Sequence, residues 1–442
     1  MDKKRQPAIN TFSLVAASII ITLPIFLKRS SFPIQKDQVV QNTEMYEFLY
    51  INDIHLDPSY IPNGNPDMPY FCNNASVLIP STHKYGQYNC DTPNETYQSM
   101  IQNIPKIIKK PQFIICGGDI PGHSVDSDFD SHIAFIKKLL DQMGDMYPDV
   151  PLLLTLGNND FYQNYGSLST DERDFLGLTN ITRLGLQGEH LETFKKGGYY
   201  YYDFEPAKIR FLLLNTVMYT TKRSDSGTDP HDQFSWMERV ISEGQSKGLT
   251  IIITMHIPPG HSDLNAKQGW HEEYISRFDE IVKKYDVKYS IAAHTHYDIF
   301  MPHYGQTGAS QGYSLSSPSV SPAHNNNPGF RVYQFNENGL IDYEQYFADI
   351  MMNPSELNWE LEYKFSQAYN VTDLSSESIQ SVVKYITTTS EGKWSYKEKV
   401  TALAMDNWKF YFCMLKATTH EQAEMCLGAL EAQRIPITPY DE

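Results

Sequence analysis

The sequence lacks the features of a nucleic-acid-binding or a repetitive protein. It contains 36 lysine and arginine residues against 53 aspartate and glutamate residues, which gives a formal net charge of -17. Such a field repels nucleic-acid backbones and anionic membranes unless a local cation offsets it. Repeats and low-complexity tracts are also absent, so the 442 residues are expected to fold as a globular protein. Long nucleic acid is therefore disfavoured as a partner, and metal ions become the obvious source of positive charge if the protein binds phosphate.

Cysteine is scarce as well, with five residues in the chain. Four of them form two pairs that are close in sequence, Cys72 with Cys90 and Cys413 with Cys426, and Cys116 lies in an apolar run. In an oxidising compartment the two pairs are expected to form disulfides while Cys116 remains a buried thiol. Asn-x-Ser/Thr sequons indicate the same compartment because they are acceptors for N-glycosylation in secreted proteins. They are Asn74, Asn94, Asn180 and Asn370.

Long apolar runs are rare, and one of them stands at the amino terminus. Residues 8–27 carry no charge over about 20 positions, enough to cross a bilayer, and basic residues flank them on both sides. We therefore predict that residues 1–30 are a targeting segment, either a cleaved signal peptide or an uncleaved type II signal-anchor in the membrane. The anchor is preferred because the run is longer than a usual signal core. Residues 31–45 are expected to form a stalk. The rest of the chain is expected to face an endolysosomal lumen or the cell exterior, as a single-pass or secreted protein.

Short apolar runs that end in polar clusters recur from residue 46 to about residue 350. These runs are YEFLYINDIH, PQFIICGGD, PLLLTLGNND, RFLLLNT, TIIITMH and KYSIAAHTH. Helical spacing appears between them, at residues 128–146, 233–246 and 273–284. The alternation predicts an α/β catalytic domain over 46–350, with strands buried on both faces. Residues 351–442 change character and are expected to form a C-terminal helical subdomain.

The polar residues that directly follow the apolar runs form a set suited to metal ions. Ligands gather at the carboxyl ends of strands in α/β sheets, so these residues should converge in space. They are Asp53, His55, Asp119, Asn158, His256, His294 and His296. Oxygen and imidazole donors without a thiolate suit two borderline divalent ions such as zinc, manganese or iron. Two such ions activate water near neutral pH and stabilise displacement at phosphorus, so the implied reaction is phosphoester hydrolysis by a metal-bound hydroxide.

Each motif also has an ordinary structural explanation when it stands alone. Asp53-x-His55 occurs by chance, and Gly-Asp after a strand is often merely a turn. His294-x-His296 is more specific, because alternate residues of an extended segment point the same way. The metal-site hypothesis therefore rests on the ordered combination, in which every cluster follows a predicted strand.

The ordered motifs resemble those of the calcineurin-like metallophosphoesterases. They are Asp53-x-His55, Gly118-Asp119, Gly157-Asn158, His256 and His294-x-His296. More narrowly, CDTP, GGDIPGHS, MHIPPGH, AHTHYDIF and SPSVSPAHNNNPGFRVYQF look like the acid sphingomyelinase-like phosphodiesterases. The resemblance implies a four-layer α/β/β/α sandwich with a dinuclear centre, for which zinc is the expected metal. It assigns one ion to Asp53, His55, Asp119 and His296, and the other to Asp119, Asn158, His256 and His294.

The resemblance also implies a class of substrate. Acid sphingomyelinases carry a saposin-like module before the catalytic domain, whereas a short stalk is expected here, so the saposin-free branch is the better match. That branch hydrolyses small soluble phosphodiesters and pyrophosphates, such as nucleotides and CDP-choline. A sphingomyelin phosphodiesterase activity remains an alternative, because an anchor would hold the enzyme near lipid. A non-enzymatic metal-binding receptor is a further alternative, and the complete ligand set argues against it.

One position departs from the family pattern. The family has a histidine after the metal-ligand asparagine, whereas this chain has Asn159, in LLLTLGNNDFY. An amide cannot titrate, so Asn159 cannot deliver a proton to a leaving group. A second family histidine is retained as His123, which is the candidate general acid or phosphate contact. His261, in HIPPGHS, is expected either to line the substrate cleft or to be a structural histidine.

The tetrapeptide Gly-Asn-Asn-Asp also resembles the form found in fungal endopolyphosphatases of the same superfamily. Their leaving group is a phosphate, which needs less protonation than an alkoxide, so an asparagine could be tolerated there. Polyphosphate is therefore an alternative substrate, although the net negative charge argues mildly against a long polyanion.

Overall fold

The computed structural model describes residues 44–65, 70–73, 83–123, 128–224, 227–260, 269–304, 310–352, 356–400, 402, 408–415 and 420–432. Residues Thr43–Glu442 belong to one compact unit. The predicted targeting segment, nearly all of the predicted stalk, the sequon Asn74 and His261 lie outside the described residues. Within the described ranges, the helices are too short or too polar to traverse a bilayer.

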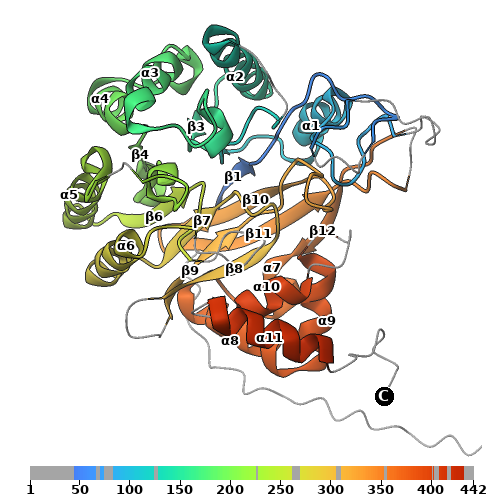
Figure 1. Cartoon of the computed structure of the whole chain (residues 1–442). Helices are drawn as coiled ribbons and strands as arrows, with labels where there is room; N and C mark the ends of the chain where they lie inside the picture. The colour runs from blue at the N-terminus through green and yellow to red at the C-terminus, as the bar shows by residue number, and fades with distance from the viewer. Residues whose placement is uncertain are drawn as a thin grey trace, which may run out of the picture. The chain divides into compact units, whose positions relative to one another are not determined.

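Two six-stranded mixed sheets form the centre of this unit (Figure 1). The strands lie in the order β12-β11-β10-β1-β2-β3 in one sheet and β4-β5-β6-β7-β9-β8 in the other. The strands are β1 Tyr46–Ile51, β2 Ile114–Cys116, β3 Leu152–Leu154, β4 Tyr200–Phe204, β5 Ile209–Leu214, β6 Thr250–Met255, β7 Tyr289–Ala292, β8 Ile299–Tyr304, β9 Ser310–Ser316, β10 Gly329–Asn336, β11 Gly339–Phe347 and β12 Glu360–Lys364. Strands β1 to β3 are mutually parallel, and so are β5 to β7, so their carboxyl ends meet at one edge of each sheet.

Aromatic side chains pack the two sheets against each other. Phe211 of β5 lies with its ring centroid 5.5 Å from that of Phe48 of β1 and 5.9 Å from that of Phe335 of β10. Phe113, which precedes β2, contacts Phe211 at 5.0 Å. Strands covered by a second sheet on one face and by helices on the other are apolar along their whole length. That burial explains why the apolar runs of the sequence do not alternate with polar residues.

Helices connect the parallel strands and cover the outer faces of the sheets. The helices are α1 Asn94–Ile107, α2 Phe129–Asp145, α3 Leu168–Thr179, α4 Gly188–Gly197, α5 Gln233–Ser246, α6 Glu272–Lys284, α7 Phe365–Tyr369, α8 Ser376–Thr388, α9 Ser390–Lys399, α10 Trp408–Met414 and α11 His420–Ala432. The three predicted helices are confirmed as α2, α5 and α6. Helix α2 begins where the Asp128 carboxylate accepts a hydrogen bond from the Ser131 backbone N–H at 2.9 Å. The predicted α/β/β/α architecture is therefore confirmed.

The C-terminal region is helical, as expected, but it also contains strand β12. This strand pairs with β11 at the edge of the first sheet. Its five residues, ELEYK, alternate polar and apolar side chains as a strand does, but Leu361 is exposed and Tyr363 is the one buried residue among them. The local pattern is therefore short, and the pairing with β11 completes the strand. Helix α8 packs against β9, so this region is in contact with both sheets.

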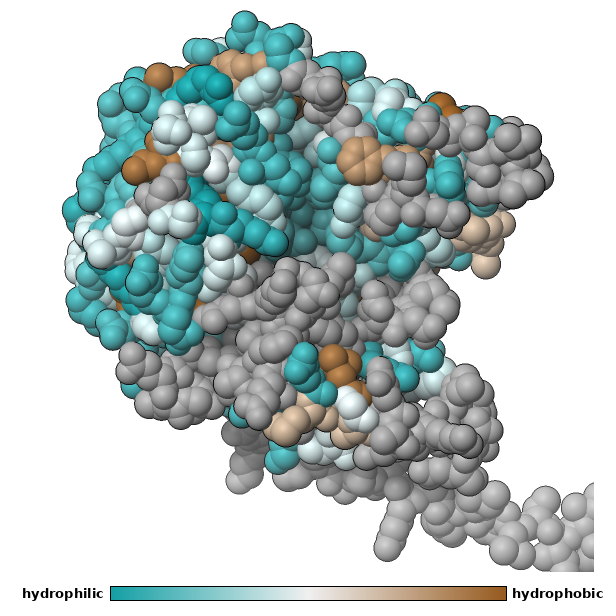
Figure 2. Space-filling view, in the orientation of Figure 1, coloured by the Kyte–Doolittle hydropathy of each residue, from teal (hydrophilic) through white to brown (hydrophobic). Residues whose placement is uncertain are grey.

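Both predicted disulfides are present. Cys72 is bonded to Cys90, and Cys413 of α10 is bonded to Cys426 of α11. Cys116 is a buried free thiol in β2, as expected. The described sequon asparagines Asn94, Asn180 and Asn370 are exposed, and their glycosylation stays a prediction. Figure 2 shows that the surface over helices α2 to α6 is largely hydrophilic, with single hydrophobic residues scattered across it.

Candidate metal centre

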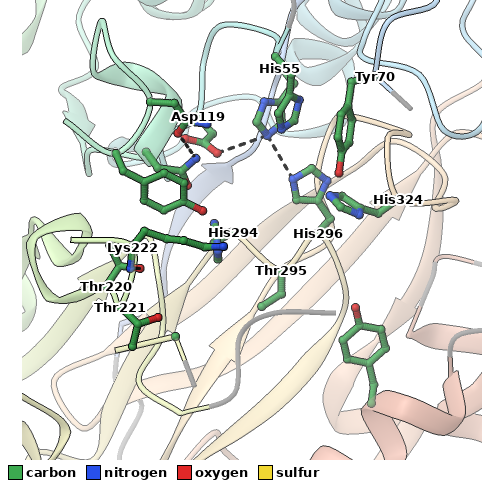
Figure 3. A pocket seen from close by; sticks show the side chains of 16 residues that line it. His55, Tyr70, Asp119, Thr220, Thr221, Lys222, His294, Thr295, His296 and His324 are labelled. Carbon is green, nitrogen blue, oxygen red and sulfur yellow. Dashed lines mark hydrogen bonds and ion pairs between the residues drawn. The ribbon is translucent and has the colours of Figure 1, made fainter. Parts of the chain in front are cut away.

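The carboxyl ends of the parallel strands bring the seven predicted ligands to one site. Figure 3 labels four of them, His55, Asp119, His294 and His296. Each ligand lies at or just beyond the end of a strand, which explains the convergence. Asp53 and His55 follow β1, Asp119 follows β2, Asn158 follows β3, His256 follows β6, and His294 and His296 follow β7. Six of these side chains are buried and His294 is half-buried.

Asp119 lies between the two groups of ligands. Its Oδ2 is 3.4 Å from His55 Nε2 and 3.3 Å from His256 Nε2. His55 Nε2 lies in turn 3.2 Å from His296 Nε2, and His296 Nε2 lies 3.6 Å from Asp53 Oδ1. A residue that is shared between two ions must lie between their ligands, and the Asp119 carboxylate has this position.

The backbone of the site adopts conformations that non-glycine residues rarely occupy. Five of the seven ligands have positive φ angles, which range from 41° at His55 to 67° at His294. Such residues persist only where the surrounding structure holds them, and they concentrate at functional sites. Here backbone hydrogen bonds hold two of them, from Asp53 N to Gly118 O at 3.0 Å and from His55 N to Asp119 O at 3.1 Å.

The glycines before Asp119 and Asn158 allow the two loops to approach each other. A Cβ atom at Gly157 would lie 2.2 Å from Asp119 Oδ1, and one at Gly118 would lie 2.4 Å from the nitrogen of Gly157. The Gly-Asp and Gly-Asn motifs are therefore required by close packing and not by turn formation alone. Asp160 joins the same loops, since its carboxylate accepts from the backbone N–H groups of Asp119 at 3.0 Å and Gly157 at 2.7 Å.

The donor atoms fit divalent ions. Nδ1 of His256 donates to the Gly117 carbonyl at 2.7 Å, and Nδ1 of His55 lies 3.2 Å from the Pro121 carbonyl, so each ring directs Nε2 to the centre. Asn158 donates its amide N–H to Asn164 at 2.9 Å, which leaves its Oδ1 to face the site. Asn158 Oδ1 and His256 Nε2 are two of the buried side-chain atoms that have no hydrogen-bond partner among the described residues. Buried polar atoms of this kind normally have a partner, and an ion would supply it.

Burial and charge set the protonation of the ligands. Burial lowers the pKa of His294 to about 3 and also lowers the pKa of His296, so both rings are neutral, which is the form that binds metal. At His256 burial has the same effect, but the neighbouring Asp119 carboxylate outweighs it and raises the pKa to about 9. Burial alone would raise the pKa of Asp119. The interaction with His256 outweighs burial, so the net shift of the Asp119 pKa is downward. The central Asp119 carboxylate is therefore ionised.

Asn159 faces the carboxylate of Asp119. Its backbone N–H donates to Asp119 Oδ1 at 2.7 Å, and its side-chain amide donates to Asp119 Oδ2 at 3.0 Å. Asn159 is not among the described residues that line the pocket. Its amide therefore contributes to the orientation of Asp119.

His123 lies beside the metal ligands and is held by a carboxylate. Its Nδ1 is 2.9 Å from Asp91 Oδ1, and its backbone N–H donates to Asp91 Oδ2 at 2.6 Å. Its ring is stacked between His55 and Tyr70, with centroid distances of 4.2 Å and 4.1 Å. Burial lowers the pKa of His123, but Asp91 outweighs this effect and the net shift is upward. Asp91, in the CDTP motif, and Tyr70 were not identified from the sequence, because only the fold places them against His123.

A pocket of about 270 Å³ opens above the ligands. Besides metal ligands, it is lined by His123, Tyr70, His324, Asn164, Tyr165, Thr220, Thr221, Lys222, Gly269, Thr295 and Tyr411. Tyr411 belongs to α10, and its ring contacts Tyr297 at 4.3 Å. The backbone N–H of Asp298 donates to the Val400 carbonyl at 3.0 Å, directly beyond the His296 loop. The C-terminal helical region is thus part of the pocket.

A four-layer α/β sandwich with a buried aspartate and histidine centre at its strand ends is the arrangement of a metallohydrolase. The family model described as calcineurin-like phosphoesterase matches residues 46–298, and the model described as acid sphingomyelin phosphodiesterase C-terminal region matches residues 315–400. The chain belongs to the calcineurin-like phosphoesterase family and is a hydrolase.

Several known proteins are similar to this chain. Human acid sphingomyelinase-like phosphodiesterase 3b is 28% identical over 367 residues, which cover 77% of this chain and 79% of that protein. Sphingomyelinase phosphodiesterase C of Dictyostelium discoideum is 28% identical over 75% of this chain and 80% of its own length. Human cyclic GMP-AMP phosphodiesterase SMPDL3A is 26% identical over an alignment that covers 77% of this chain and 79% of that protein. The solved structure of GAP50, the anchor in the inner membrane complex of Plasmodium, has a TM-score of 0.41 and 14% identity, covering 76% of this chain and 93% of that one.

Proposed function

We propose that the protein is a phosphodiesterase with a dinuclear metal centre, zinc being the expected metal, that hydrolyses small soluble phosphodiesters or pyrophosphates. The observation that carries the proposal is the convergence of the seven candidate ligands, six of them buried, beside a pocket, with His123 held next to them by Asp91. The ligands assigned to the two ions are those expected from the sequence, with Asp119 shared. When bound, the ions supply Lewis-acid stabilisation of the charge that develops on the phosphate oxygens.

His123 is the residue that supplies a proton. Nδ1 is bonded to Asp91, so Nε2 is the ring atom left for the substrate. The same hydrogen bonds fix the ring against rotation, and the stacked rings of His55 and Tyr70 exclude water from its two faces. In this arrangement His123 protonates the leaving oxygen as general acid. Asp91 acts on the reaction through His123 and is a positioning residue.

Turnover of bis-p-nitrophenyl phosphate tests the proposed function directly. We expect hydrolysis by the metal-loaded protein and loss of more than about 100-fold after chelation, because the charge at phosphorus would then lack its stabilisation. Activity should return on addition of Zn²⁺, with Mg²⁺ and Mn²⁺ as comparison ions. A metal-loaded protein that hydrolyses neither this ester, nor ATP, nor CDP-choline would contradict the proposal and favour a metal-binding receptor.

Replacing Asn159 with histidine restores the titratable group that the family pattern has at this position. We expect a gain of up to about tenfold on alkyl phosphodiesters, whose leaving groups need a proton, and a smaller change on p-nitrophenyl esters. The metal content must be measured in parallel, because the substitution removes the amide that donates to Asp119. Equal effects on both kinds of ester, at unchanged metal content, would contradict a role in protonation.

Sphingomyelin is the second candidate substrate. It is favoured by the match of residues 315–400 to the acid sphingomyelin phosphodiesterase C-terminal region and by the name of the Dictyostelium relative. Release of phosphocholine from sphingomyelin vesicles, measured beside the soluble esters, separates the two substrates. Inorganic polyphosphate belongs in the same panel, because Asn159 also matches the endopolyphosphatase pattern.

We also propose that this unit works in an oxidising compartment of the secretory pathway. The two disulfides support this, since such bonds persist mainly in secreted and lumenal proteins. The exposed asparagines of three sequons are accessible to glycosylation. A mass shift on treatment with a glycosidase checks the assignment.

A further inference from the structure

The two walls of the pocket differ in chemistry. Figure 3 shows Tyr70 and His324 on one wall and Thr220, Thr221 and Lys222 on the other. The first wall presents aromatic rings. The second presents two hydroxyl groups and one ammonium group, which are donors to anionic oxygen. A substrate that occupies both walls therefore meets unlike surroundings on the two sides of the scissile phosphate.

Lys222 is the one permanently cationic side chain among the described residues that line the pocket. The side chain runs along the wall toward the ligand His294 (Figure 3). The Lys222 side chain is exposed at the pocket, where a ligand can reach its ammonium group. The whole protein carries a formal net charge of -17, which makes a lysine at this place a local exception. Such a charge attracts an anionic group into the pocket.

The backbone on both sides of Lys222 is held in place. Thr220 forms an isolated antiparallel bridge with Trp270, and the backbone N–H of Thr221 donates to the Gly269 carbonyl at 3.0 Å. On the other side, Arg223 points inward and its guanidinium donates to both oxygens of the buried Asp171, at 3.1 Å and 2.9 Å. The chain therefore turns Arg223 into the core and Lys222 into the pocket. The Lys222 side chain itself is exposed, so the anchored backbone, and not burial of the side chain, places it at the pocket.

We propose that Lys222, with the hydroxyl groups of Thr220 and Thr221, binds a second phosphoryl group of the substrate, next to the phosphate that is hydrolysed. The scissile phosphate is held by the metal centre, so the ammonium group contributes only when the substrate carries a further negative charge. Esters that carry a neighbouring phosphate are then preferred over esters that carry a cationic choline, because the ammonium group repels the cation. This assignment of specificity rests on the proposed function, since it requires hydrolysis at the metal centre.

Three substrates with different substituents test this inference. ATP carries additional phosphates, bis-p-nitrophenyl phosphate carries no second charge, and p-nitrophenyl phosphocholine carries a cation. In Lys222→Met we expect kcat/KM for ATP to fall about tenfold, as for the loss of one charge-assisted hydrogen bond. The value for bis-p-nitrophenyl phosphate should change less than about twofold. Lys222→Arg should retain most of the ATP activity, and Lys222→Glu should lower it further while raising the activity on the choline ester.

The exposed Lys283 of α6, which does not line the pocket, provides the matched control as Lys283→Met. An equal loss on all three esters in Lys222→Met, or no loss on ATP, would overturn the inference while leaving the proposed function intact. Failure of the wild-type protein to hydrolyse any of the three would instead contradict the proposed function. The two hypotheses are therefore distinguished by the same experiment.

Discussion

Replacement of Asp119 with asparagine is expected to reduce turnover more than any other single change, by at least about 1,000-fold. Asp119 is the carboxylate between the two ligand groups, within 3.4 Å of both His55 Nε2 and His256 Nε2. An amide keeps the shape of the side chain but removes the negative charge that would be shared by two cations. We expect the variant to lose metal as well as activity, so kcat for bis-p-nitrophenyl phosphate and metal content should be measured on the same samples.

The control for this prediction is Asp149→Asn, at an exposed position that does not line the pocket. It should retain wild-type activity and metal content, because surface substitutions away from special features have small effects. Circular dichroism shows whether Asp119→Asn is folded. A folded Asp119→Asn variant that holds two ions and keeps more than about a tenth of the activity would refute the bridging role.

Replacement of His123 with glutamine is expected to give the second largest loss, about 100- to 1,000-fold in kcat on alkyl phosphodiesters. Glutamine can still donate a hydrogen bond to a phosphate oxygen, but it cannot transfer a proton at Nε2. The loss should be much smaller on p-nitrophenyl esters, because p-nitrophenolate leaves without protonation. This dependence on the leaving group separates a general acid from a residue that only binds phosphate.

Substitution of Asp91 provides a second test of His123 as the general acid. Asp91→Asn should lower kcat on alkyl esters by a smaller factor than His123→Gln, because the ring is still present but its orientation and tautomer are no longer held. The metal content should be unchanged, since neither residue is among the seven predicted ligands. His190→Gln, at a half-buried position of α4 that does not line the pocket, is the matched control. A uniform loss on all leaving groups in His123→Gln would assign the histidine to substrate binding alone.

The C-terminal region has a direct part in this site. Tyr411 of α10 reaches the pocket, and the Val400 and Ala402 carbonyls accept hydrogen bonds from Asp298 N and from the Asn327 side chain at 3.0 Å and 2.8 Å. Asp298 is two residues beyond His296, so the first of these contacts adjoins the site. Substitutions in α10 should therefore affect substrate specificity and not only stability.

Much of the site could be predicted from the sequence because its ligands belong to short local sequence patterns. Apolar runs that end in aspartate, asparagine or histidine identified strands and the ligands at their ends, since the carboxyl ends of parallel strands must meet. The pairs Cys72–Cys90 and Cys413–Cys426 were predicted from short spacing, which limits the loop that each bond closes. Strand β12 was missed although ELEYK alternates polar and apolar residues, because the run is only five residues long and helices follow it directly.

The sequence by itself determined the α/β class, the seven candidate ligands and the departure at Asn159. Only the tertiary structure decided what surrounds them: Asp91 behind His123, Tyr70 on its ring, the amide of Asn159 on Asp119, and Lys222 opposite the aromatic wall. The physical reason is that ligands follow strands at fixed positions along the chain. Their supporting residues come from loops and helices far away in sequence, and only packing brings these together.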